Sequence, residues 1–327
     1  MILVLPTLVI LSLFSLSAFA QTSISPEVEK RANEIIATIH DNFTKINDTG
    51  TLVYDAKAFE HYNRLVDAFD YYDKAVTLDP YDDQAKFGKE QVYQKITDAT
   101  SQIIKSEGLL SNQSNSFEAL SMKGQALLSL QQYDDAQKFC LQAAQIEQGL
   151  QVDQCAFNAL LELHKYKEAQ DFSKTWTIPS SPDVIVMKMI PMYQLGQYYD
   201  MISYIDDAIS KYPDGTQNLQ FQIAKVMILE NMHKQDEANA IYKTLYPSVD
   251  ESLVDRIKAS LYFTFKDYDR AIFFISASPG ADDQIGYMKV IAVDEIVKSQ
   301  NDPSHNQSSF GFFEPILQFF KNLFHWQ

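Results

Sequence analysis

The sequence predicts an all-helical solenoid, a fold built from stacked pairs of helices. Two observations carry this prediction. A string of apolar, small and aromatic residues recurs along the chain at nearly constant spacing, which is typical of repeat architectures. Residues that break helices are also scarce, with 10 Gly and 11 Pro among 327 residues, whereas apolar residues make up 46% of the chain and can form a continuous core.

The recurring string is clearest in the unit that starts at Phe117. Its landmarks, at unit positions 4, 8, 11, 14, 17, 20, 24 and 27, are Leu120, Gly124, Leu127, Leu130, Tyr133, Ala136, Cys140 and Ala143. The apolar residues at positions 4, 11 and 14 recur near helical spacing and predict the buried stripe of a first helix. Small residues at positions 8, 20 and 27 allow a second helix to approach closely, and the tyrosine at position 17 covers the turn between the two helices.

The same landmarks define further units along the chain. They start at Thr49, Leu150 and Pro182, and more weakly near Leu219 and Ser252, so that successive starts lie 68, 33, 32, 37 and 33 residues apart. The first interval is two periods long, which predicts a degenerate unit at 83–116. Glu90, Gln102 and Ser106 replace the small or apolar residues of that unit. It is expected to form either one longer helix or a hinge.

These units resemble the tetratricopeptide repeat (TPR). The resemblance implies a right-handed α-solenoid of about six to seven TPR-like helix pairs over 49–280, with a concave groove that binds a protein or peptide. A helix that starts near Pro26, within an N-terminal segment at 21–48, and a second helix at 281–299 are expected to cap the two ends.

The first twenty residues predict a secretory signal peptide at 1–20. They carry no charged side chain, are apolar from Ile2, and end in Ala18-Phe19-Ala20, a small-x-small cleavage site. No Lys or Arg precedes the apolar run, so an uncleaved membrane anchor is the alternative. Either outcome predicts a secreted or extracytoplasmic, cell-surface location, with membrane association in the second case.

Sites of covalent modification agree with export. Four Asn-x-Ser/Thr sequences are candidate N-glycosylation sites, at Asn42, Asn47, Asn112 and Asn306. Cys140 and Cys155 are the two cysteines of the chain. They form either a disulfide, as exported proteins permit, or two buried thiols in apolar helices.

The C-terminal segment, 300–327, combines a polar linker with an aromatic amphipathic tail. A helix that starts at Pro315 would gather its apolar side chains on one face. Three alternatives stay open for this helix: docking on the last repeat, insertion into a partner's groove, or contact with a membrane surface. The residues expected to contact a partner or membrane are Phe312, Phe313, Phe319, Phe320, Phe324 and Trp326.

Charge and motifs limit the classes of function. The chain has 27 Lys and Arg against 43 Asp and Glu, a net charge of -16, which opposes binding to nucleic acid. His164 and His233 share unit position 15 with Gln131, Gly196 and Lys266, so this position is expected to be an exposed turn. Adjacent acidic residues do not converge on a helix, and no zinc, phosphate-loop or nucleophile signature is present in the sequence.

The sequence therefore predicts no catalytic residues, no metal site and no cofactor. It predicts an exported TPR scaffold that binds a protein or peptide partner in its concave groove. One alternative is an extracytoplasmic assembly factor tethered to a membrane by its ends. Another is a protein that binds a saccharide or a small molecule in the groove.

Overall fold

The computed structural model describes residues 48–177, 180–246, 249–277 and 282–301, and these form fourteen helices and no strands. The all-helical prediction is thereby confirmed. The signal peptide, Asn42, Asn47, Asn306 and the aromatic tail lie outside the described residues.

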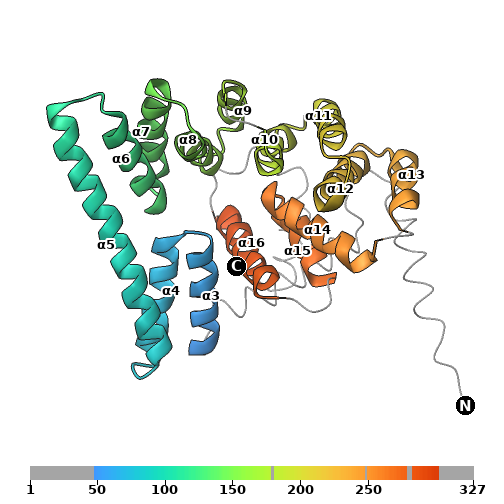
Figure 1. Ribbon diagram of the computed structural model, residues 1–327. Coiled ribbons are helices and arrows are strands. Elements are labelled where there is room, and N and C mark those ends of the chain that lie inside the picture. Colours follow the sequence, from blue (N-terminus) through green and yellow to red (C-terminus); the bar gives the residue numbers. More distant parts are fainter. Residues whose placement is uncertain (1–47, 178–179, 247–248, 278–281, 302–327) are drawn as a thin grey trace, which may run out of the picture.

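Six antiparallel helix pairs and two further helices make up the described part of the chain (Figure 1). The pairs are α3 (Thr49–His61) with α4 (Leu65–Leu78), α6 (Phe117–Ser129) with α7 (Tyr133–Ile146), α8 (Leu150–Glu162) with α9 (Tyr166–Lys174), α10 (Pro182–Gln194) with α11 (Tyr198–Lys211), α12 (Gly215–Asn231) with α13 (Gln235–Leu245), and α14 (Glu251–Thr264) with α15 (Tyr268–Ala277). The two further helices are α5 (Asp83–Asn112) and α16 (Asp283–Asn301). Four first helices begin at the residue where the repeated pattern places a unit start, and α12 and α14 begin slightly earlier.

Unit position 15 reverses the chain between the helices of every pair. The six residues at this position have φ between 55° and 66°: Asn63, Gln131, His164, Gly196, His233 and Lys266. In the first pair, the amide of Asn63 donates to the carbonyl of Glu60 at 3.0 Å, and the amide of Arg64 donates to that of Phe59 at 2.8 Å. This is the Schellman pattern that ends a helix with one left-handed residue. Five of the six are not glycine, which is why the position looks unspecified in the sequence.

Small residues set the distance between the two helices of a pair. A Cβ added to Gly124 of α6 would lie 2.3 Å from Sγ of Cys140 and 3.0 Å from its backbone nitrogen in α7. The alanines at the corresponding contact points, including Ala56, Ala68 and Ala136, are fully buried. The close approach predicted from the small landmarks is therefore what the structure has.

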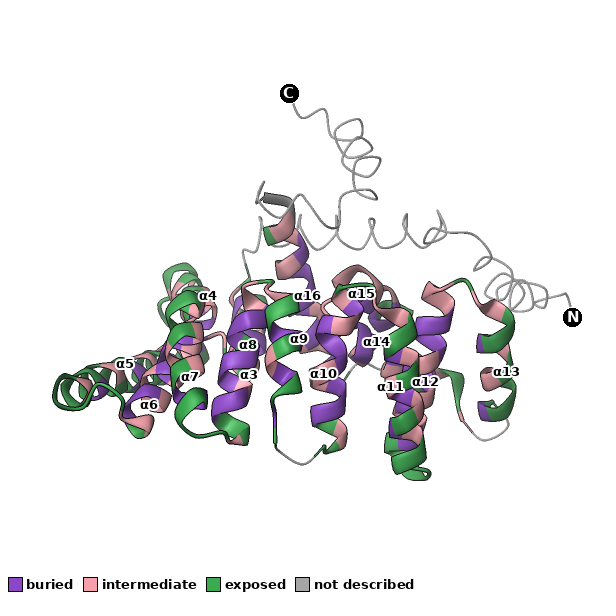
Figure 2. Ribbon diagram, turned by 90° about the horizontal axis from the view of Figure 1, so that it is seen from above, coloured by how far each residue is buried: buried purple, intermediate pink, exposed green. Residues whose placement is uncertain are grey.

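The degenerate unit forms one continuous helix. α5 has 30 residues, and the Asp82 side chain caps its N-terminus by accepting hydrogen bonds from the amides of Gln84 and Ala85. It buries only a narrow stripe: Ala85, Gly88, Val92, Ala99 and Ser106. Figure 2 shows the result, with α5 largely exposed while α8 and α10 are largely buried. Without a turn at position 15, the chain continues as a helix from the first pair to the pair α6–α7.

The helix array closes on itself, because α16 packs against both α15 and α3 (Figure 1). Val290 and Ile291 of α16 belong to the same apolar core as Leu52, Ala56 and Phe59 of α3. The ring centroids of Tyr54 and Tyr287 lie 5.2 Å apart across this contact. The sequence predicts α16 as a cap for the last pair. The structure shows that it also covers the first pair, more than 200 residues away in the chain.

Candidate functional site

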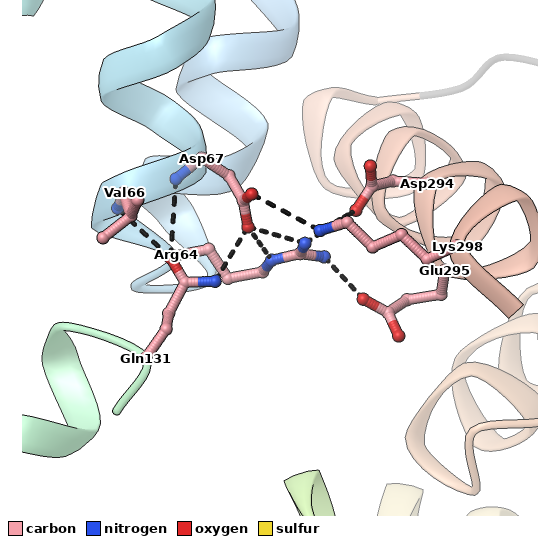
Figure 3. A network of polar contacts seen from close by, with 7 residues as sticks. All are labelled: Arg64, Val66, Asp67, Gln131, Asp294, Glu295 and Lys298. Atoms are coloured by element: carbon pink, nitrogen blue, oxygen red, sulfur yellow. Dashed lines mark hydrogen bonds and ion pairs between the residues drawn. The ribbon is translucent and has the colours of Figure 1, made fainter. Parts of the chain in front are cut away.

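The turn between α3 and α4 lies at the centre of the ring closure. Arg64, which follows the left-handed Asn63, donates from Nη2 to Asp294 Oδ2 at 2.6 Å and from Nη1 to Glu295 Oε1 at 2.9 Å (Figure 3). Its Nε donates to Asp67 Oδ2 at 2.7 Å. Lys298 pairs with Asp294 at 3.0 Å and with Asp67 at 3.4 Å. We call Arg64, Asp67, Asp294, Glu295 and Lys298 the closure site.

Burial and charge oppose each other in the closure site. The Arg64 side chain is 12% exposed. Burial alone would lower the pKa of Arg64, but Asp67, Asp294 and Glu295 outweigh it and raise that pKa. Burial would likewise raise the pKa of Asp67, yet Arg64 and Lys298 hold it below its ordinary value. The guanidinium therefore stays charged and holds three carboxylates from two distant parts of the chain.

The second helix pair, α6–α7, also reaches the closure site. The amide nitrogen of Gln131, in the α6–α7 turn, donates to Asp67 Oδ2 at 2.8 Å, and its amide oxygen accepts from the backbone nitrogen of Val66 at 3.2 Å (Figure 3). Asn63 donates to the hydroxyl of Ser129 at 3.3 Å. Gln131 occupies unit position 15, where an exposed turn was expected. Gln131 is only partly exposed, because this turn faces another pair of the same chain, whereas His164 and His233 at the same position are exposed, as expected.

The turn between α14 and α15 packs against helices of earlier pairs, on the inner side of the array. Lys266 pairs with Glu162 of α8 at 2.9 Å. Tyr193 of α10 donates to Asp267 Oδ2 at 2.5 Å, and the Tyr62 and Phe263 rings lie 5.1 Å apart. The TPR resemblance implied an open concave groove. Here the last helix pair lies inside the arc of helices (Figure 1), where it contacts α8, α10 and the turn that follows α3.

The predicted turn tyrosines surround these charges. Tyr133, Tyr166 and Tyr268 stand at unit position 17, as expected for residues that cover a turn. Burial first, and then negative charge that includes Glu162, raises the pKa of each of the three phenols. Tyr166 also lies 2.7 Å from Nδ1 of His164. These contacts assign the tyrosines and His164 to packing and hydrogen bonding around the turns.

A hollow lies between α5 and α6. It has a volume of about 490 Å³ and is lined by Gln102 and Lys105 of α5 and by Phe117, Glu118, Ser121, Met122 and Gln125 of α6. The residues that α6 buries against its neighbours, such as Leu120, Gly124 and Leu127, are not among them. One face of α6 is thus packed, while the other borders open space.

The hollow lies on the α3 side of α5. Lys95 of α5 pairs with Glu60 of α3 at 2.7 Å, whereas Lys89 pairs with Asp73 of α4. Gln102 follows Lys95 by seven residues, about two helical turns, and so shares its face. The hollow is therefore bordered by α5 and by α6, the first helix of its pair.

The side chains of the hollow provide hydrogen-bonding groups, apolar surface and charges of both signs. Gln102, Ser121 and Gln125 carry donors and acceptors for peptide groups, Phe117 and Met122 offer apolar contact, and Lys105 and Glu118 are exposed charges of opposite sign. Among the described residues, no three His, Cys, Asp or Glu side chains are grouped so that they could hold a metal ion. None of the described helices combines the length and the apolar character that crossing a membrane requires.

Two of the predicted modification sites fall within the described residues. Cys140 of α7 and Cys155 of α8 form a disulfide, and both residues are buried. Asn112 is exposed at the C-terminal end of α5, where its amide nitrogen donates to the carbonyl of Gly108 at 3.2 Å. Asn112 follows Lys105 by seven residues and therefore shares its face of the helix.

The residues of the closure site were not identified as a group from the sequence. Arg64 and Asp67 stand at the start of α4, whereas Asp294, Glu295 and Lys298 belong to α16, and no local spacing relates these two groups. One signal was available: the chain has only four arginines, and the three within the described residues, Arg64, Arg256 and Arg270, all pair with carboxylates. Arginine in a lysine-rich chain favours bidentate or multiple pairing.

No family model and no curated protein sequence matches the chain. Solved structures overlap it in part. A tetratricopeptide repeat protein from Parabacteroides merdae is 12% identical with a TM-score of 0.37, and the match covers 75% of this chain and 98% of that one. The Cut9–Hcn1 hetero-tetramer of APC/C is 12% identical with a TM-score of 0.36, and covers 88% of this chain and 56% of that one. The TPR domain of P58(IPK) is 14% identical with a TM-score of 0.24, and covers 80% and 82%.

Two of these three structures are described as TPR proteins, the class that the repeated landmarks indicate. At such identities and TM-scores the overlaps say nothing of this chain's partner. The fold assignment rests on the six helix pairs, the small residues between their helices and the left-handed residue at position 15. The chain is an α-solenoid of TPR-like helix pairs whose ends are joined by α16.

Proposed function

We propose that the protein is an exported, non-catalytic scaffold that binds an extended segment of a protein partner in the hollow between α5 and α6. The observation that carries this proposal is the hollow itself, which α5 and one face of α6 leave uncovered, whereas the α14–α15 turn contacts α8 and α10 elsewhere in the array. A hollow of about 490 Å³ accommodates a few residues of a partner.

The chemistry of the hollow favours a peptide as the ligand. Amide and hydroxyl groups pair with the backbone of an extended segment, while Phe117 and Met122 contact one apolar side chain. Phe87 and Leu109 lie on the same face of α5 as Lys105 and are 65% and 39% exposed. They extend the apolar contacts along the helix in both directions, as a partner segment longer than the hollow requires.

Export is supported by the sequence at 1–20 and by two described features. The pairing of Cys140 with Cys155 suits an oxidising compartment. Asn112 is exposed, as a glycan acceptor must be. A tether through the apolar ends of the chain, as in a membrane-bound assembly factor, is compatible with the same surface and stays a second proposal.

Site-specific photo-crosslinking tests the binding site. A photoreactive phenylalanine analogue at Gln102 or Gln125, in protein secreted by its own host, is expected to trap the partner. The same analogue at Thr97, exposed on α5 and rotated by about 140° from Gln102, is the matched control and is expected to trap nothing. Equal trapping at all three positions, or none, would refute the site. Recovery of a carbohydrate or small molecule in place of a peptide would favour the other class of ligand.

A further inference from the structure

The contact between α16 and the first helix pair contains more acidic than basic groups. Within the closure site, Arg64 and Lys298 face Asp67, Asp294 and Glu295. Lys266 and Glu162 stand beside Glu295 from the α14–α15 turn and from α8. Without Asp55, the contact between α16 and the first helix pair therefore has four carboxyl groups and three cations.

Asp55 of α3 adds a further carboxyl group to this contact. It is 4% exposed, and Asp294 of α16 is the charged group that acts on it most strongly. Tyr71 of α4 lies close enough to Asp55, Asp67, Asp294 and Arg64 to be influenced by all four. No ion pair among the described residues includes Asp55. With Asp55, five carboxyl groups face three cations, so two negative charges stay uncompensated if all the groups are ionised.

We infer that the closure of the ring by α16 is a pH-dependent latch, held by a protonated Asp55 at acidic pH and loosened when Asp55 ionises beside Asp294. Like charges in a buried contact cannot both be solvated, so either one carboxyl group takes a proton or the two helices separate. Because two negative charges stay uncompensated in this contact, raising the pH is expected to separate α16 from α3. Opening would expose the faces of α3 and α16 that are now buried against each other.

Burial, followed by the charge of Asp294, raises the pKa of Asp55 to about 7, from an ordinary value of 3.8. A raised folded-state pKa means that the closed form binds more protons than the open form between about pH 4 and pH 7. The stabilisation of the closed form is therefore fully present below about pH 4 and is lost as the pH rises through 7. Asp67 has a lowered pKa and acts in the opposite direction only at more acidic pH.

The ratio of closed to open protein is expected to fall by up to about a hundredfold between pH 5 and pH 8. Spin labels at Lys57 of α3 and Gln284 of α16, both exposed, report the separation of the two helices by pulsed electron resonance. In the wild-type chain, one short distance at pH 5 should give way to longer, broader distances at pH 8. In Asp55→Asn, which has the same shape and no charge, the short distance should persist at both pH values.

His61 supplies the control, because its ring lies 5.5 Å from that of Tyr287 in the same contact. His61→Gln is expected to open like the wild type. Circular dichroism verifies that each variant is folded, and Asp55→Leu, which is also uncharged and close in size, replaces Asp55→Asn if that variant does not fold. An unchanged wild-type distance at pH 5 and pH 8 would overturn the latch, and so would loss of the response in His61→Gln.

Discussion

The closure site and the hollow between α5 and α6 differ in what covers them. Arg64 is 12% exposed and is held by carboxylates of α4 and α16. Lys105 and Glu118 border the hollow and are exposed. Where a helix distant in sequence covers a charged side chain, as α16 covers Arg64, that side chain forms buried ion pairs that stabilise the fold. Where no described helix does so, charged side chains stay accessible to a partner.

The largest expected effect comes from removing the cation of the closure site. Arg64→Ala leaves Asp67, Asp294 and Glu295 close together with one fewer positive charge, so it is expected to lower the free energy of unfolding by about 3–5 kcal/mol. Chemical denaturation measures this change. The loss should be larger at pH 5, where α16 is held against α3, than at pH 8.

Arg256→Ala is the matched control for this prediction. Arg256 pairs with Asp282, but the two side chains are 39% and 49% exposed. Solvent screens such a pair, and its loss is expected to cost under about 1 kcal/mol. Similar losses for the two variants would show that the closure site stabilises the fold no more than a surface ion pair does. The distinction drawn between the closure site and the hollow would then be wrong.

An intermediate effect is expected at the packed face of α6, opposite the hollow. A Cβ at Gly124 would press on the sulfur and the backbone of Cys140, neither of which can move freely, so Gly124→Ala is expected to destabilise the protein by about 1–3 kcal/mol. Gly108→Ala in α5 meets no atom within 4 Å and should stabilise it by about 0.5–1 kcal/mol. Thermal unfolding of the two variants measures both signs. Stabilisation by Gly124→Ala would contradict the close packing of α6 on α7.

The sequence could predict the features that depend on residues close together in the chain. Starts of units, small residues such as Gly124 and the tyrosines of position 17 recur at fixed spacing, and each determines a contact within one helix pair or between successive pairs. The left-handed turn escaped notice because Gln131, His164 and Lys266 adopt a conformation usually associated with glycine. The closure could not be predicted, since Arg64 and Asp294 are brought together only by the curvature of the whole array.

The smallest effect on stability, and the sharpest contrast with Arg64, is expected at Lys105. Its side chain is exposed, so Lys105→Glu should change the free energy of unfolding by at most about 0.5 kcal/mol. Partner recovery in the crosslinking experiment at Gln102 should nevertheless fall, because the substitution reverses the charge at the edge of the hollow. Lys138→Glu, exposed on α7 outside the hollow, gives the same net charge and should leave recovery unchanged. If both variants reduce recovery equally, the partner responds to the overall charge of the protein and not to the hollow. A loss confined to Lys105→Glu would show that Lys105 contributes to binding the partner, whereas Arg64 contributes to closing the fold.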